Sequence, residues 1–109
     1  PLIHGDGEVV VAAKAGAYII SPFIGRLDDI SQNGMDLIRQ VVTIYRNYGF
    51  KTQVIVAALR NGKQIADAAR MGADIVTAGL AVYQAAFEHP FTRKGLQIFQ
   101  DAWDKTAQA

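Results

Sequence analysis

Ala12-Ala13-Lys14-Ala15-Gly16-Ala17-Tyr18-Ile19-Ile20 is followed, 56 residues later, by a second copy of the same pattern, Ala68-Ala69-Arg70-Met71-Gly72-Ala73-Asp74-Ile75-Val76. Each copy predicts the end of a helix, a glycine that stops it, and then a short apolar strand, because glycine tolerates the positive φ angle that follows many helices. A further apolar segment, Gln53–Ala58, lies between the two copies. Two strand–helix units of about 28 residues therefore fill the repeat, which fits a βαβ crossover.

Helices and strands are predicted to alternate on both sides of this repeat. We expect helices near Glu8–Ala15, Gly34–Tyr48, Gly62–Met71 and Leu80–Phe87. We expect strands at Tyr18–Phe23, Gln53–Ala58 and Ile75–Thr77. A break at Pro90 precedes a last helix that Thr92 is expected to cap. The strands are nearly continuous apolar runs, typical of parallel strands buried on both faces, so the pattern predicts an α/β sheet or barrel.

The composition is that of a soluble globular protein. Half of the 109 residues are hydrophobic, 19% are charged, and the net charge is +1. The basic residues are spread along the chain, so no nucleic-acid partner is expected. No apolar run is long enough to span a bilayer, and we expect no signal peptide. The lack of cysteine excludes a thiolate nucleophile and favours the cytoplasm.

An arginine follows each of two predicted strand ends, where sites gather in parallel α/β structures. Arg26 lies in the first of these loops and Arg60 in the second. Two guanidinium groups on one rim would suit a phosphate, since arginine donates in a planar fork, and a helix N-terminus near Gly62 could add backbone donors. The alternative is that the arginines are solvated or pair with Asp28 and Asp29.

The other polar candidates are expected to be structural. His4 lies in a predicted turn, and His89 precedes Pro90 in another. Two isolated histidines do not make a metal site, and we expect no metal and no cofactor. No lysine sits in an apolar strand end, where burial would favour Schiff-base chemistry, so no catalytic residue is assigned to this chain. The five lysines of the chain, none of them in such a position, are Lys14, Lys51, Lys63, Lys94 and Lys105.

Four stretches resemble the small transaldolase family, which includes the fructose-6-phosphate aldolases. They are AAKAGAYIISPFIGRLDDI (12–30), IYRNYGFKTQVIVAALR (44–60), MGADIVTAG (71–79) and HPFTRKGLQIFQDAWDK (89–105), of which SPFxGRxDD is the most specific. The resemblance implies a TIM (β/α)₈ barrel, assembled as pentamers or decamers. It also implies transfer or aldol cleavage of a dihydroxyacetone unit from a sugar phosphate, through a Schiff base on a lysine of strand four.

The resemblance assigns the chain a part of that barrel. A full barrel needs ~200 residues or more, so this chain can hold only about half of one. We expect residues 1–109 to form a single segment, the C-terminal part of the barrel. This segment begins near the end of strand five and covers strands six to eight, their helices and a C-terminal helix. A partial barrel leaves open strand edges and an open apolar face, so we expect a homo-oligomer or association with the missing half. The last helix carries an apolar stripe of Leu96, Phe99 and Trp103 that could pack on its own barrel or on a neighbour.

The resemblance also assigns substrate-binding roles. Arg26 and Arg60 match family positions that bind the sugar phosphate, and Phe23 matches the aromatic residue beside the Schiff base, where phenylalanine favours the transaldolase branch. Ala58 stands where the family usually has a phosphate-binding serine, which removes a hydrogen bond worth roughly 0.5–1.5 kcal/mol. Pro1 replaces a threonine that usually organises the catalytic water.

The stretch beginning at His4 also departs from the family, which usually has Phe-Ser there. The departures at Ala58 and at the N-terminus favour one rival to a transaldolase-like enzyme, a non-catalytic phosphosugar-binding or structural half-barrel fragment. A third possibility is an unrelated flavodoxin-like α/β binding module.

Overall fold

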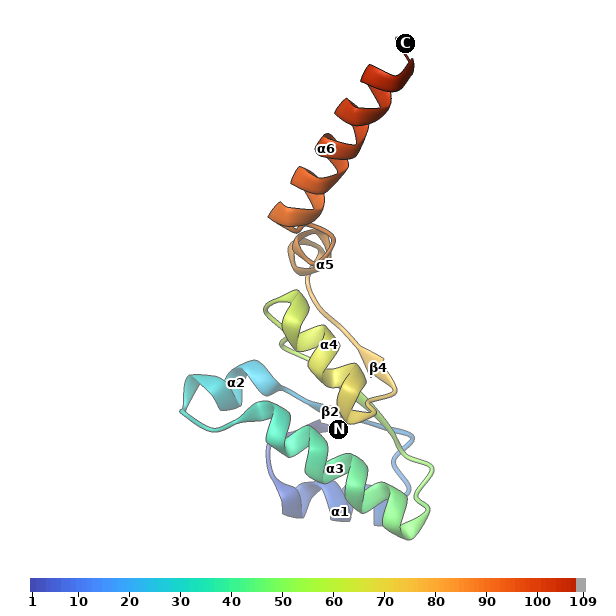
Figure 1. Ribbon diagram of the computed structural model, residues 1–109. Helices are drawn as coiled ribbons and strands as arrows, with labels where there is room; N and C mark the ends of the chain where they lie inside the picture. Colours follow the sequence, from blue (N-terminus) through green and yellow to red (C-terminus); the bar gives the residue numbers. More distant parts are fainter. Residues whose placement is uncertain (108–109) are drawn as a thin grey trace.

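A parallel four-stranded sheet with helices forms the body of the computed structural model, which describes residues 1–107 (Figure 1). The strands lie in the order β1-β2-β3-β4, and each pair is parallel. The elements are β1 (Leu2–Ile3), α1 (Asp6–Lys14), β2 (Ile19–Pro22), α2 (Ile24–Asp29), α3 (Gly34–Tyr48), β3 (Gln53–Val56), α4 (Gly62–Met71), β4 (Ile75–Val76), α5 (Leu80–Ala86) and α6 (Pro90–Ala107).

Among the described strands, the order in the sheet follows the order along the chain. A doubly wound flavodoxin-like sheet reverses its strand order at a switch point, and no such reversal occurs among these strands. Helix α3 contacts both α1 and α4, so the connecting helices share one face of the sheet, as crossovers of a single hand between successive neighbours require. The α/β class predicted from the sequence is therefore confirmed, and the winding fits a barrel segment better than a flavodoxin-like module.

The core lies between the sheet and helices α1, α3 and α4. Alternate strand residues such as Ile20 and Val56 are completely buried against these helices, whereas their neighbours on the other face are only partly covered. Helix α3 contributes one apolar face to this core, as its sequence pattern predicted. The buried positions of α3 are Gly34, Leu37, Ile38, Val41, Val42 and Tyr45.

One buried hydrogen bond joins α1 to α3. The Tyr45 hydroxyl donates to the Val9 carbonyl at 2.9 Å, and its ring meets Phe50 edge to face with centroids 5.7 Å apart. Burial raises the pKa of Tyr45 above its usual value, so the hydroxyl stays protonated and remains a donor.

Tyr45→Phe is expected to lower the free energy of unfolding by about 1 kcal/mol, because the ring packing stays while the buried hydrogen bond to the Val9 carbonyl is lost. Urea denaturation measures the change. Tyr18→Phe is the matched control, since the Tyr18 side chain is 78% exposed. Equal stabilities of the two variants would mean that the hydrogen bond contributes nothing.

The ends of α3 and α4 follow the sequence prediction. Gly49 and Gly72 end these helices with φ angles of 63° and 91°, in the left-handed region that favours glycine. Asn33 and Asn61 cap their first turns through side-chain oxygens. Gly16, which follows α1, has a φ angle of 89°, so the repeat noted in the sequence marks two equivalent helix-to-strand junctions, at Gly16 before β2 and at Gly72 before β4.

Two features differ from the sequence prediction. Helix α2 occupies most of the predicted loop after β2, because Ile24 and Leu27, three residues apart, are both buried. Thr92 does not cap α6, so that prediction is wrong. The helix begins at Pro90, and the Phe91 N–H donates to Nδ1 of His89 at 3.1 Å. Proline suits the first helical position because the missing N–H is unpaired there in any case.

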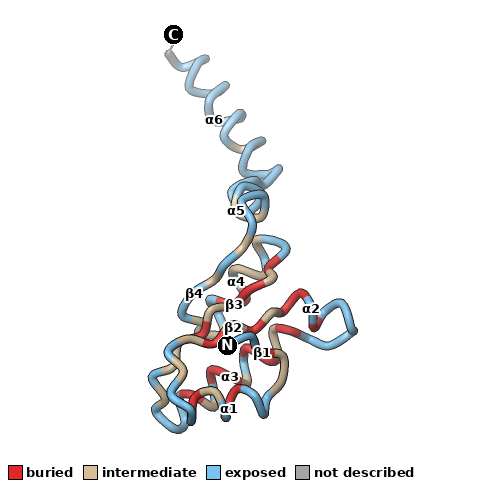
Figure 2. The backbone as a smooth tube through the Cα atoms, turned by 180° about the vertical axis from the view of Figure 1, so that it is seen from behind, coloured by how far each residue is buried: buried red, intermediate tan, exposed pale blue. Residues whose placement is uncertain are grey.

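Helix α6 projects away from the body and is exposed along nearly its whole length (Figure 2). The described chain measures 69 × 30 × 20 Å with a radius of gyration of 19.4 Å, whereas a compact chain of this length has about 13 Å. The apolar stripe of Leu96, Phe99 and Trp103 is exposed and does not pack on this chain's own sheet. Among the described residues, no helix combines the length and apolar character needed to traverse a membrane.

Candidate functional site

The two arginine-bearing loops lie side by side at the C-terminal edge of the sheet. Pairing between β2 and β3 continues past both strands, as Phe23 and Ala57 form a parallel bridge. The Ala57 N–H donates to the Pro22 carbonyl at 2.9 Å, and the Ile24 N–H donates to the Ala57 carbonyl at 3.1 Å. The β2–α2 and β3–α4 junctions are therefore one connected unit.

Gly25 allows this close approach. A Cβ atom built there would lie 2.6 Å from the Ala58 carbonyl oxygen, closer than real Cβ contacts come. The Gly25 carbonyl in turn accepts a hydrogen bond from Nη2 of Arg60 at 3.1 Å. A side chain at Gly25 would push apart the two loops that carry the arginines.

Arg60 forms an ion pair with Asp29. Its Nη2 atom lies 2.8 Å from both carboxylate oxygens. For this arginine, the pairing with an aspartate that the sequence left open as an alternative does form. Both side chains are about half exposed, at 53% and 56%, so the pair stabilises the fold by at most ~1 kcal/mol. Asp29 and the Gly25 carbonyl both bind the same nitrogen. They hold the guanidinium in place while its Nη1 donors face no hydrogen-bond partner within residues 1–107.

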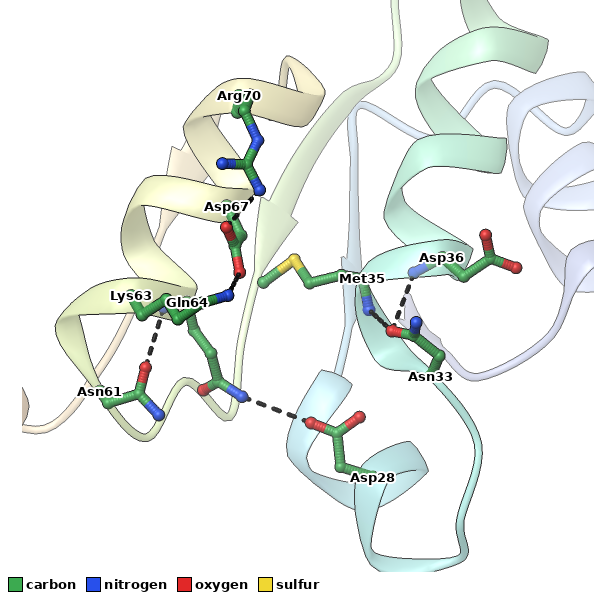
Figure 3. A network of polar contacts seen from close by, with 9 residues as sticks. All are labelled: Asp28, Asn33, Met35, Asp36, Asn61, Lys63, Gln64, Asp67 and Arg70. Atoms are coloured by element: carbon green, nitrogen blue, oxygen red, sulfur yellow. Dashed lines mark hydrogen bonds and ion pairs between the residues drawn. The ribbon is translucent and has the colours of Figure 1, made fainter.

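Asp28 joins three elements. Its Oδ1 accepts from the Gly34 N–H at 3.0 Å. Its Oδ2 accepts from Nε2 of Gln64 at 3.3 Å, as Figure 3 shows. Gln64 also accepts from the Arg60 backbone N–H at 2.7 Å, in a variation of the capping box. The two adjacent aspartates therefore hold the two loops together. The roles of Gly25 and Gln64 in this arrangement were not predicted from the sequence.

Arg26 is placed differently from Arg60. Its guanidinium carbon lies 4.8 Å from the centroid of the Phe23 ring, a cation–π contact, and the side chain is exposed. Among residues 1–107, Arg26 makes no ion pair. Phe23 is therefore a platform that orients a free cation at the same edge as Arg60.

Ala58 has a strained backbone. Its φ angle is +59°, which places a non-glycine residue in the left-handed region. Such outliers cost on the order of 1 kcal/mol or more and cluster at functional sites. Ala58 directs the chain from β3 toward Arg60, so the strain lies at the turn that positions this arginine.

The structure thus brings Phe23, Arg26, Ala58 and Arg60 to one edge of the sheet. A cavity of about 330 Å³ opens at the same edge, between the starts of α1 and α3, and is not lined by these four residues. Its lining is His4, Gly5, Asp6, Leu27, Gln32, Asn33, Asp36, Leu37 and Gln40. In the described residues, no three side chains of metal-ligating type come together.

Asp67, on the helix that follows Arg60, is nearly buried between two cations. It accepts a hydrogen bond from Lys63 at 3.0 Å and pairs with Arg70 (Figure 3). The hydrogen bond from Lys63, helped by the charges of both cations, lowers the pKa of Asp67 below its usual value.

Asp67→Asn is expected to destabilise the fold at neutral pH but not at low pH. A lowered folded-state pKa means that the carboxylate stabilises the fold above the unfolded value of about 3.9. This stabilisation disappears as the pH falls through the folded value. Urea denaturation from pH 7 to pH 2 should show the wild type and the variant converging. Asp104→Asn, on exposed α6, is the control, and its effect on stability at neutral pH should stay within about 0.5 kcal/mol.

Comparison with known proteins identifies the family. Residues 2–109 match the family model described as Transaldolase/Fructose-6-phosphate aldolase. A probable transaldolase from Paracoccus denitrificans (strain Pd 1222) is 54% identical over 107 residues, which are 98% of this chain and 49% of that protein. One from Anaeromyxobacter sp. (strain K) is 50% identical over 102 residues, 94% of this chain and 47% of that protein.

A probable transaldolase from Cereibacter sphaeroides (strain ATCC 17029 / ATH 2.4.9) is 51% identical over 108 residues, 99% of this chain and 49% of that protein. The chain spans about half the length of the curated relatives it matches. The predicted resemblance is confirmed: with its parallel sheet and its paired strand-end loops, the chain belongs to the transaldolase/fructose-6-phosphate aldolase family.

Proposed function

We propose that residues 1–109 are the C-terminal part of a transaldolase-like (β/α)₈ barrel. In this assignment β1 is the end of strand five, and β2, β3 and β4 are strands six to eight. The one-directional strand order supports it, as does the coverage of about half of each relative. The complete protein would transfer or cleave a dihydroxyacetone unit of a sugar phosphate through a Schiff base, and this chain would supply the phosphate-binding side.

The observation that carries the proposal is the pair of arginines on adjacent strand ends. Arg60 is fixed through one nitrogen by Asp29 and the Gly25 carbonyl, so its remaining donors are oriented before any ligand arrives. Arg26 is held on Phe23 without an acidic partner in the described chain. Two oriented guanidinium groups at one edge suit a phosphate, whose oxygens accept charge-assisted hydrogen bonds.

The Schiff-base lysine is assigned to polypeptide outside this chain. Lys14 and Lys63 lie on helices α1 and α4, Lys94 and Lys105 on α6, and Lys51 between α3 and β3 at the opposite edge of the sheet. None of the five lies on a described strand or in a loop that directly follows one, where the catalytic residues of such barrels are found. Lys63, in the first turn of α4, is paired with Asp67.

Borohydride trapping with fructose 6-phosphate tests the enzymatic part. The protein that completes the barrel should yield a reduced, stable adduct on a lysine outside residues 1–109, and this chain alone should yield none. No adduct on the completed protein would contradict the proposal, as would an adduct on any of the five lysines here.

A second candidate is a non-catalytic phosphosugar-binding half barrel. Ala58, where the family usually has a serine hydroxyl, and Pro1, where it usually has threonine, favour it. This candidate predicts binding of a sugar phosphate that Arg26→Ala weakens, with no turnover by the completed protein. Turnover would exclude it.

We also propose that this chain associates with copies of itself or with the missing half of the barrel. The sheet face away from the helices exposes Leu2 and Ile75, and α6 exposes the stripe of Leu96, Phe99 and Trp103. Exposed apolar groups of this extent favour association. Light scattering should therefore show a species larger than the monomer, and a stable, monodisperse monomer would contradict the prediction.

A further inference from the structure

His4 occupies the place beside Phe23 at the C-terminal edge of the sheet. The strands pair with Leu2 opposite Ser21 and Ile3 opposite Pro22, so His4 comes next, level with Phe23. Ile3 and Pro22 are buried toward the helices. Side-chain alternation directs Phe23 to the opposite, helix-free face, and His4, just past the end of β1, lies between Phe23 and the cavity at the starts of α1 and α3 that it also lines.

The imidazole of His4 is available to a ligand. Its ring centroid lies 6.4 Å from that of Phe23, at an interplanar angle of 54°. The nearby carboxylate of Glu8 accepts from the His4 backbone N–H at 3.3 Å rather than from the ring. Within residues 1–107 neither ring nitrogen makes a hydrogen bond, although the residue is half-buried. A half-buried imidazole without a partner offers both a donor and an acceptor.

The order of residues along the edge indicates which part of a ligand His4 would meet. Arg60 follows β3, Phe23 and Arg26 follow β2, and His4 follows β1. Neighbouring strands lie about 4.8 Å apart, so a sugar phosphate held by the two arginines would reach His4 with its carbon chain extended across Phe23. In that orientation the hydroxyl groups of the chain, and not the phosphate, would meet the imidazole.

We propose that His4 is a specificity-determining residue that hydrogen-bonds a hydroxyl group of the sugar chain. The inference rests on the proposed phosphate-binding role of Arg26 and Arg60, and it adds recognition of the hydroxylated part of the substrate. Phosphate without a hydroxylated chain gains nothing from this contact, which separates the role of His4 from that of the arginines.

The test is an NMR titration that measures how tightly this chain binds fructose 6-phosphate and, separately, inorganic phosphate. His4→Phe should weaken binding of fructose 6-phosphate about three- to tenfold, the equivalent of one lost hydrogen bond, and leave inorganic phosphate unaffected. His4→Gln keeps an amide donor and acceptor and should retain most of the affinity. His4→Ala, which adds no bulk, should behave as His4→Phe does if the loss comes from the missing imidazole.

Two results would overturn the inference. One is unchanged affinity for fructose 6-phosphate in both His4→Phe and His4→Ala, and the other is an equal loss for both ligands, which would mean that His4 only supports the fold. Failure of the underlying phosphate site looks different, because the wild type would then bind neither ligand and Arg26→Ala would change nothing.

Discussion

Gly25→Ala is expected to lower the free energy of unfolding by about 2–3 kcal/mol and to weaken binding of a sugar phosphate at the same time. The new methyl group would stand 2.6 Å from the Ala58 carbonyl oxygen and 3.1 Å from Nε of Arg60. Relief requires the β2–α2 and β3–α4 junctions to separate, because the first of these contacts is with backbone. Urea denaturation and a titration with fructose 6-phosphate, made on the same samples, measure the two effects.

Gly7→Ala is the matched control for this substitution. Gly7 lies in α1, and a Cβ atom there would meet nothing within 4 Å. Alanine is favoured over glycine within helices by about 0.5–1 kcal/mol, so this variant should be slightly more stable than the wild type. If Gly25→Ala proved as stable as Gly7→Ala, the two loops would not be packed as described.

Ile38→Ala is expected to cost about 2–5 kcal/mol of stability, the range for removing a buried isoleucine side chain from a packed core. Ile38 is completely buried on α3, where the helix meets the sheet. The loss combines the transfer of the removed atoms with the cavity that they leave. The midpoint of urea unfolding should fall with an unchanged slope.

Val11→Ala is the corresponding control, because Val11 is 67% exposed on α1. Its effect should stay within about 0.5 kcal/mol. A small loss for Ile38→Ala, comparable to that of Val11→Ala, would place Ile38 outside the core and would contradict the packing of α3 against the sheet.

The parts of the fold that the sequence predicts well are those with a local physical signal. Gly16, Gly49 and Gly72 all have positive φ angles in the structure, and each follows the end of a helix. Glycine is the residue type that marks such positions, so the helix-to-strand junctions could be located from sequence. The 15-residue helix α3 was equally clear, since its apolar positions recur over four turns.

The features that sequence reasoning missed are short or depend on distant contacts. Helix α2 has six residues, too few for a periodic pattern to stand out. The start of α6 is capped by a ring nitrogen of His89, which is not among the usual capping residues. The position of His4 beside Phe23 depends on the register between β1 and β2, which no local sequence pattern reveals.

The candidate site shows the same division. The sequence placed Arg26 and Arg60 after neighbouring strands, because parallel strands end at one edge. It left open whether the arginines would face a ligand or pair with Asp28 and Asp29. The structure shows that one of these pairs forms, between Arg60 and Asp29 across 31 positions of the chain, and that a single guanidinium nitrogen carries it.

A titration with fructose 6-phosphate and with unphosphorylated fructose, followed by NMR on the wild type, Arg26→Ala and Arg60→Ala, tests the phosphate-binding rim most directly. We expect the wild type to bind the phosphorylated sugar in preference to fructose. Each arginine variant should lose about tenfold or more of that affinity, since hydrogen bonds to charged groups contribute about 1.5–3 kcal/mol. Equal binding of the two sugars, or unchanged affinity in both variants, would contradict the account.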